Sequence, residues 1–81
     1  MSNLVVKVKS RDGFPGGNEP ETTVWISGEY DAAPSYGPAY GNMGYRNAVE
    51  HAKRLAKVLG ADLDIAPMGK FLSQLQAEGR A

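Results

Sequence analysis

Hydrophobic and polar residues alternate along the first part of the chain. In the segment LVVKVK, Leu4, Val6 and Val8 share one side of an extended backbone. Lys7 and Lys9 share the other side. Such alternation is typical of a strand with one buried and one solvated face, so we predict a half-buried strand at residues 4–9.

A second strand is predicted at residues 22–27, TTVWIS, because β-branched and aromatic residues dominate this segment. Val24 and Ile26 point to one side of it and Trp25 to the other. If Val24 and Ile26 face the core, Trp25 lies on the opposite face of the sheet. Residues 11–21 between the two strands are rich in Gly, Pro, Asp and Asn, which is typical of a turn-rich connection.

The hydrophobic spacing then changes to that of a helix. Apolar positions recur every three or four residues and form one stripe, which comprises Tyr45, Ala48, Val49, Ala52, Leu55, Ala56 and Leu59. Asn42 is the expected N-cap residue, and Gly60 follows the last apolar position as a helix-ending glycine does. This amphipathic helix is the element that the sequence indicates most strongly.

Two further elements are expected after the helix. Residues 61–67, ADLDIAP, alternate again and predict a short strand that Pro67 ends. Residues 69–78 suit either a short C-terminal helix or an edge strand. A right-handed crossover through the helix would place the third strand beside the first and antiparallel to it. The sequence therefore predicts a single α+β domain over residues 1–81, with β-β-α-β order and a three-stranded antiparallel sheet (order 2-1-3) packed against one helix.

The segment YDAAPSYGPAYGNMGY, residues 30–45, holds all four tyrosines of the chain with three glycines and two prolines. Glycine and proline interrupt both helices and strands, so we expect a long Tyr/Gly/Pro loop at about residues 28–43. Tyr45 continues the helical stripe and is assigned to the core. The loop serves either as an interaction loop or as a purely structural connection.

The charges are balanced in number but not in position. Nine basic and nine acidic residues give a net charge of zero. Residues 12–45 contain five acidic residues and no Lys or Arg, whereas Lys53, Arg54 and Lys57 form a basic patch on the helix. A zero net charge argues against a protein that mimics DNA over its whole surface.

The residues with reactive side chains do not form a recognisable catalytic motif. The chain lacks cysteine, and its one histidine, His51, is interpreted as a helix-surface residue. Asp62 and Asp64 are interpreted as the solvated face of a strand. We therefore predict a non-enzymatic protein with no catalytic residues, metal or cofactor. No apolar run is long enough to span a membrane and no secretory leader is visible, so a cytoplasmic location is expected.

Protein binding is the favoured function, because tyrosine and tryptophan offer a large rigid area with a polar tip. The expected partner-binding residues are Tyr36, Tyr40, Tyr30, Glu29, Asp31 and Trp25. The acidic members would steer the chain to a partner with a basic surface. Two alternatives remain: a nucleic-acid-binding accessory protein that uses Lys53, Arg54 and Lys57, and a homo-oligomeric structural protein that pairs through the sheet face of Trp25.

The LVVKVK strand, and the AVEHAKRLAKVLG helix that runs into ADLDIAP and MGKFLSQL, give the chain an architecture that resembles small phage-encoded anti-CRISPR proteins. This resemblance implies a soluble inhibitor that blocks a basic nucleic-acid-binding surface of a host CRISPR surveillance complex. It also implies a location in the host-cell cytoplasm. Acidic groups would then take the place of phosphates.

Overall fold

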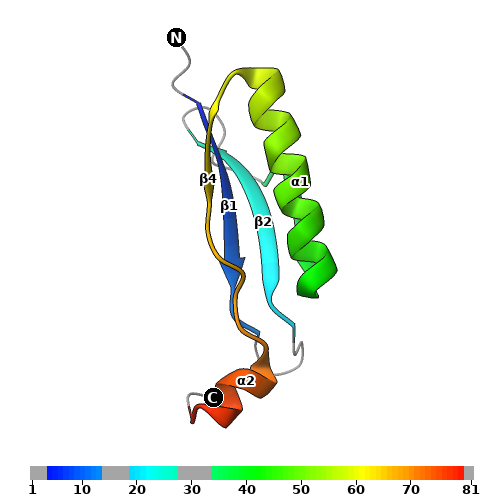
Figure 1. Ribbon diagram of the computed structural model, residues 1–81, viewed down its shortest axis with the longest axis vertical. Coiled ribbons are helices and arrows are strands. Elements are labelled where there is room, and N and C mark those ends of the chain that lie inside the picture. Colours follow the sequence, from blue (N-terminus) through cyan, green and yellow to red (C-terminus); the bar gives the residue numbers. More distant parts are fainter. Residues whose placement is uncertain (1–3, 14–18, 28–33, 80–81) are drawn as a thin grey trace.

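The computed structural model describes residues 4–13, 19–27 and 34–79. Within them the chain forms a four-stranded mixed sheet with one long helix and one short helix, in β-β-β-α-β-α order (Figure 1). The elements are β1 (Val5–Arg11), β2 (Glu21–Ser27), β3 (Tyr36–Tyr40), α1 (Gly41–Leu59), β4 (Asp62–Ile65) and α2 (Leu72–Ala77). The α+β class expected from the sequence is confirmed.

The sheet has the order β3-β2-β1-β4. Strands β1, β2 and β3 are joined by antiparallel pairings, whereas β4 lies beside β1 and runs parallel to it. The prediction of three antiparallel strands was therefore wrong in the number of strands and in the direction of the last one. The third predicted strand does lie beside the first. The unpredicted strand β3 explains both errors. It reverses the chain once more before the helix, so a crossover through α1 returns the chain parallel to β3 and hence parallel to β1.

Strand β3 occupies part of the segment for which a loop was expected. Only residues 34–43 of the predicted loop at 28–43 are described, and Tyr36–Tyr40 pair with β2 while α1 begins at Gly41. Gly37 permits this pairing because its φ is +95° and a Cβ there would lie 2.7 Å from the carbonyl oxygen of Thr22. The residue that precedes the first turn of α1 is Tyr40, so the assignment of Asn42 as N-cap was wrong.

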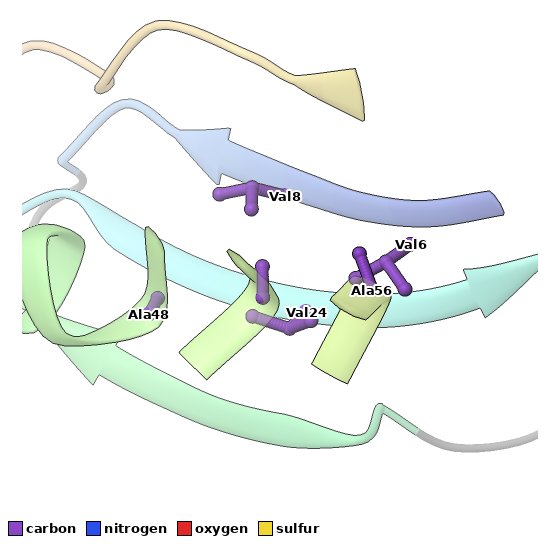
Figure 2. Close-up of a cluster of buried hydrophobic side chains, with 6 residues drawn as sticks. Val6, Val8, Val24, Ala48 and Ala56 are labelled. Atoms are coloured by element: carbon purple, nitrogen blue, oxygen red, sulfur yellow. The ribbon is translucent and has the colours of Figure 1, made fainter. Parts of the chain in front are cut away.

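The core lies between α1 and one face of the sheet. Val6 and Val8 of β1 and Val24 of β2 face three alanines of the helix, Ala48, Ala52 and Ala56 (Figure 2). Burying each valine side chain contributes about 1.5–3 kcal/mol. The alanines follow one another at four-residue spacing and let the helix approach the strands closely. The predicted helical stripe is thus confirmed, except that Leu59 is exposed.

Helix α1 ends as the sequence predicts. Gly60 is the C-cap residue with φ +64°, and its backbone N–H points to the carbonyls of Ala56 and Lys57. A left-handed φ is easily adopted by glycine and costs other residues about 1–2 kcal/mol. The chain then turns directly into β4, where the Ala61 N–H donates to Ala56 O at 2.9 Å.

Strand β4 is an edge strand that α1 covers only in part. Its Leu63 and Ile65 align with Val6 and Val8 of β1, which places them on the α1 side as predicted. They nevertheless remain 38% and 37% exposed.

The C-terminal element is a helix, so the edge-strand alternative for residues 69–78 was wrong. Helix α2 lies beyond the end of the strands (Figure 1). Three hydrogen bonds hold the chain before α2 against the end of β1 and the two residues after it: Gly69 N–H to Ser10 Oγ, Lys70 N–H to Asp12 Oδ1, and Gly13 N–H to Lys70 O. In the described ranges, no helix is long and apolar enough to cross a membrane.

Candidate interaction surface

The sheet has a second face, which none of the described elements covers. Residues on this face alternate with the core residues along β1 and β2, since successive side chains of a strand point to opposite sides. We call this surface the open face. Its members are Val5, Lys7, Lys9 and Arg11 of β1, and Glu21, Thr23, Trp25 and Ser27 of β2. By register, Asp62 and Asp64 of β4 and Tyr40 of β3 share it.

Trp25 is the largest side chain of the open face, and its neighbours hold it in place. Its indole N–H donates to Thr23 Oγ1 at 2.8 Å. The ammonium group of Lys9 lies 5.6 Å from the ring centroid, within the range of a cation–π interaction. Trp25, Lys7, Lys9 and Ser27 line a shallow depression of about 230 Å³. The ring is therefore orientated before any partner binds, which lowers the entropy cost of using it in an interface.

The open face carries a positive row, a negative row and one further acidic residue, Glu21 of β2, which aligns with Arg11. Lys7, Lys9 and Arg11 follow one another at alternate positions of the inner strand β1. Asp62 and Asp64 occupy the adjoining edge strand β4, where Asp64 aligns with Lys7. Neighbouring strands are about 4.8 Å apart, so the positive row and the negative row run side by side. The surface around Trp25 is thus positive on one flank and becomes negative at the edge of the sheet.

The structure separates the tyrosines that the sequence grouped together. Tyr36 projects toward α1, where its ring stacks on His51 with centroids 4.7 Å apart, and it packs against the core. Tyr45 also packs against the core, as predicted, and its hydroxyl donates to Ala66 O at 2.7 Å. Tyr40 is 51% exposed and aligns with Glu21 of the open face. Tyr40 and Trp25 therefore share a surface, whereas Tyr36 lies on the other side of the sheet.

The remaining predicted partner-binding residues, Glu29, Tyr30 and Asp31, lie outside the described residues. The alternative basic patch is present as three exposed side chains, Lys53, Arg54 and Lys57, on α1. Since α1 packs on the other side of the sheet, this patch is separate from the open face.

Sequence reasoning placed Trp25 away from the core but missed Lys7 and Lys9 as its neighbours. The signal was the alternation in LVVKVK, which puts both lysines on the solvated side of β1. The strand register supplies what the pattern could not: Lys7 aligns with Trp25, and Lys9 aligns with Thr23.

A second hollow, of about 400 Å³, lies along α1 and is lined by Met43, Tyr45, Arg46, Asn47, Val49 and Glu50. Of the residues that the structure describes, those that line it all come from this one helix. Among the described residues, no group of three or more His, Cys, Asp or Glu side chains is placed to hold a metal ion.

Comparison with protein-family models, with curated proteins and with solved structures found no match to this chain.

Proposed function

We propose that this chain is a non-enzymatic protein-binding module that contacts its partner through the open face. The observation that carries the proposal is Trp25. Its ring is fixed by Thr23 and Lys9 on a sheet face that no described element covers. Tryptophan is the residue type most enriched among those that dominate binding energy at interfaces. A fold that leaves its one tryptophan on such a face offers a ready anchor for a partner.

The edges of the sheet are less suited to this role than its face. Edge strands bind partners by continuing the backbone hydrogen bonding of the sheet. Strand β3 contains Pro38, which has no N–H to donate, and its pairing with β2 is interrupted by an irregularity between Thr22 and Val24. Strand β4 carries Asp62 and Asp64, and charged residues on an edge discourage further strand pairing. Both features favour the face over the edges.

The role implied by the resemblance, inhibition of a CRISPR surveillance complex, is one form of this function. A basic partner surface would contact the acidic row of Asp62 and Asp64, while Trp25 would pack beside it. The proposal also revises the residues to be tested. Tyr36 packs against the core, so replacing it should loosen the fold, whereas Tyr40 and Trp25 can be replaced without removing a core residue.

A pull-down from nuclease-treated bacterial lysate tests the proposal. The tagged wild-type chain is compared with Trp25→Ala and with a matched control, Lys53→Gln combined with Lys57→Gln, on the exposed side of α1. Loss of an anchoring tryptophan typically costs 2 kcal/mol or more, which is about a 30-fold loss of affinity. We expect the wild type and the control to retain a partner that Trp25→Ala loses, with circular dichroism unchanged in all three.

If Trp25→Ala recovers as much of the partner as the wild type does, the open face is not part of the interface. A partner lost only by the Lys53 and Lys57 control would place the binding site on the helix and not on the open face. Light scattering at two concentrations tests the homo-oligomer alternative, for which the mass should rise with concentration in the wild type and not in Trp25→Ala.

A further inference from the structure

The positive row on β1 indicates which charges, and at what spacing, a partner of the open face should carry. Lys7, Lys9 and Arg11 stand at alternate positions of one strand, so their side chains emerge about 6.8 Å apart on the same side. An extended peptide has the same repeat. Acidic side chains at alternate positions of an extended partner segment can therefore meet the three cations in turn, whereas alternate residues of a helix are only about 3 Å apart along its axis and point to opposite sides.

Trp25 adds an apolar contact beside this row. It aligns with Lys7 on the neighbouring strand, and Lys9 lies over its ring. A segment that follows β1 would thus have the indole along one flank and the ammonium groups beneath its carboxylates. We infer that the open face binds an extended acidic segment of the partner protein, orientated along β1; the inference rests on the proposed function of the face.

The negative row on β4 is the reason to expect a protein segment and not a nucleic acid. Asp64 aligns with Lys7, and Asp62 is on the same side of β4, one strand spacing from β1. A single strand of nucleic acid has a negative charge at every nucleotide, so part of its backbone would run close to these carboxylates. A peptide carries acidic groups only where its sequence places them, and it can set neutral or basic side chains against Asp62 and Asp64.

The chain contains one tryptophan, so emission excited selectively from tryptophan reports on this face alone. The experiment titrates the full chain with three probes at low salt. The first is a short synthetic peptide with glutamate at alternate positions and threonine between them. The second has glutamine in place of glutamate, and the third is an oligothymidine of matching length. The variants are Lys7→Gln with Lys9→Gln, and the control Lys53→Gln with Lys57→Gln.

We expect the glutamate peptide to change the Trp25 emission in a saturable way that weakens as salt is added. Each exposed ion pair that is lost should reduce affinity about 1.4- to 5-fold. The Lys7 and Lys9 variant should therefore bind the peptide several-fold more weakly than the wild type, whereas the Lys53 and Lys57 control should bind it equally.

Three outcomes would overturn the inference. Equal binding of the glutamine peptide would show that acidic groups are not what the face selects. Stronger binding of oligothymidine than of the glutamate peptide would show that the face binds single-stranded nucleic acid. The absence of any response to the glutamate peptide at millimolar concentration would exclude an acidic segment. None of these results decides whether Trp25→Ala loses a cellular partner, so failure here is distinguishable from failure of the proposed function.

Discussion

The two faces of the sheet are built from the same strands but differ in what lies against them. On the covered face, Val6, Val8 and Val24 are fully or almost fully buried beneath α1. On the open face, one residue away in each strand, Lys7, Lys9 and Trp25 surround a shallow depression. Since the side chains of a strand alternate, every core residue of β1 and β2 has a sequence neighbour on the open face. Stability and binding are thus encoded at adjacent positions of the same segment.

Helix α1 contributes small residues to the centre of the core. The core residues that α1 buries fully or almost fully are Ala48, Ala52 and Ala56, and the larger, partly buried side chains of the helix pack around them: Tyr45, Val49 and Leu55. A chain of this length buries only about 60–65% of the surface of its unfolded form, which makes its stability modest. Substitutions on the covered face should therefore reduce the stability of the fold strongly, and substitutions on the open face should mainly reduce the affinity for a partner.

Introducing a charge on each face in turn should give the largest contrast. Val8→Asp places a carboxylate where the side chain is 1% exposed, and we expect it to cost more than about 3 kcal/mol and to unfold much of the protein. Lys9→Asp introduces the same group on the open face and should cost about 1 kcal/mol, from strand propensity and the lost contact with Trp25. Urea denaturation followed by circular dichroism measures both. Similar losses in the two variants would mean that the open face is buried in solution.

Enlarging a helix residue on the covered side should have an intermediate effect. Ala52 is fully buried between α1 and the sheet, so Ala52→Leu should overpack the core and cost about 1–3 kcal/mol. Lys53→Leu places the same side chain at the adjacent position, which is exposed. The free energy of unfolding of this variant should change by less than about 0.5 kcal/mol. Thermal unfolding of the two variants compares them directly. If Ala52→Leu were as stable as the wild type, the helix would be packed less closely on the strands than the structure shows.

The elements that sequence periodicity could predict are those with a clean pattern. Strands β1 and β2 alternate, α1 has a continuous apolar stripe, and Gly60 marks its end. Strand β3 has no such pattern, because Tyr36–Tyr40 contains Gly37 and Pro38, which usually indicate a turn. An edge strand tolerates a proline because one side of it is free of ladder hydrogen bonds. Omitting this one strand was enough to reverse the predicted direction of β4.

The candidate site could be predicted only in part, for the same reason. Alternation alone placed Trp25 away from the core. The assignment of Tyr36 to the interface was made without β3, whose pairing turns that ring toward His51. The position of Lys7 and Lys9 next to Trp25 depends on the register between β1 and β2, and no pattern within a single strand specifies a register.

Two neighbouring threonines provide the finest test of the difference between the faces. Thr22 is fully buried, and its hydroxyl lies 3.2 Å from Ser10 Oγ, which in turn accepts the Gly69 N–H. Thr22→Val would leave the Ser10 hydroxyl with one partner fewer, so we expect a cost of about 0.5–1.5 kcal/mol.

Thr23→Val removes the acceptor of the Trp25 indole N–H. Because Thr23 is on the open face, water can take the place of the lost hydroxyl, and we expect a cost below about 0.5 kcal/mol together with a shift in Trp25 emission. Urea denaturation gives the two free energies, and fluorescence gives the shift. A larger loss of stability for Thr23→Val than for Thr22→Val would show that the indole contact supports the fold itself. Trp25 would then be a structural residue of the sheet and a poor choice of anchor for a partner.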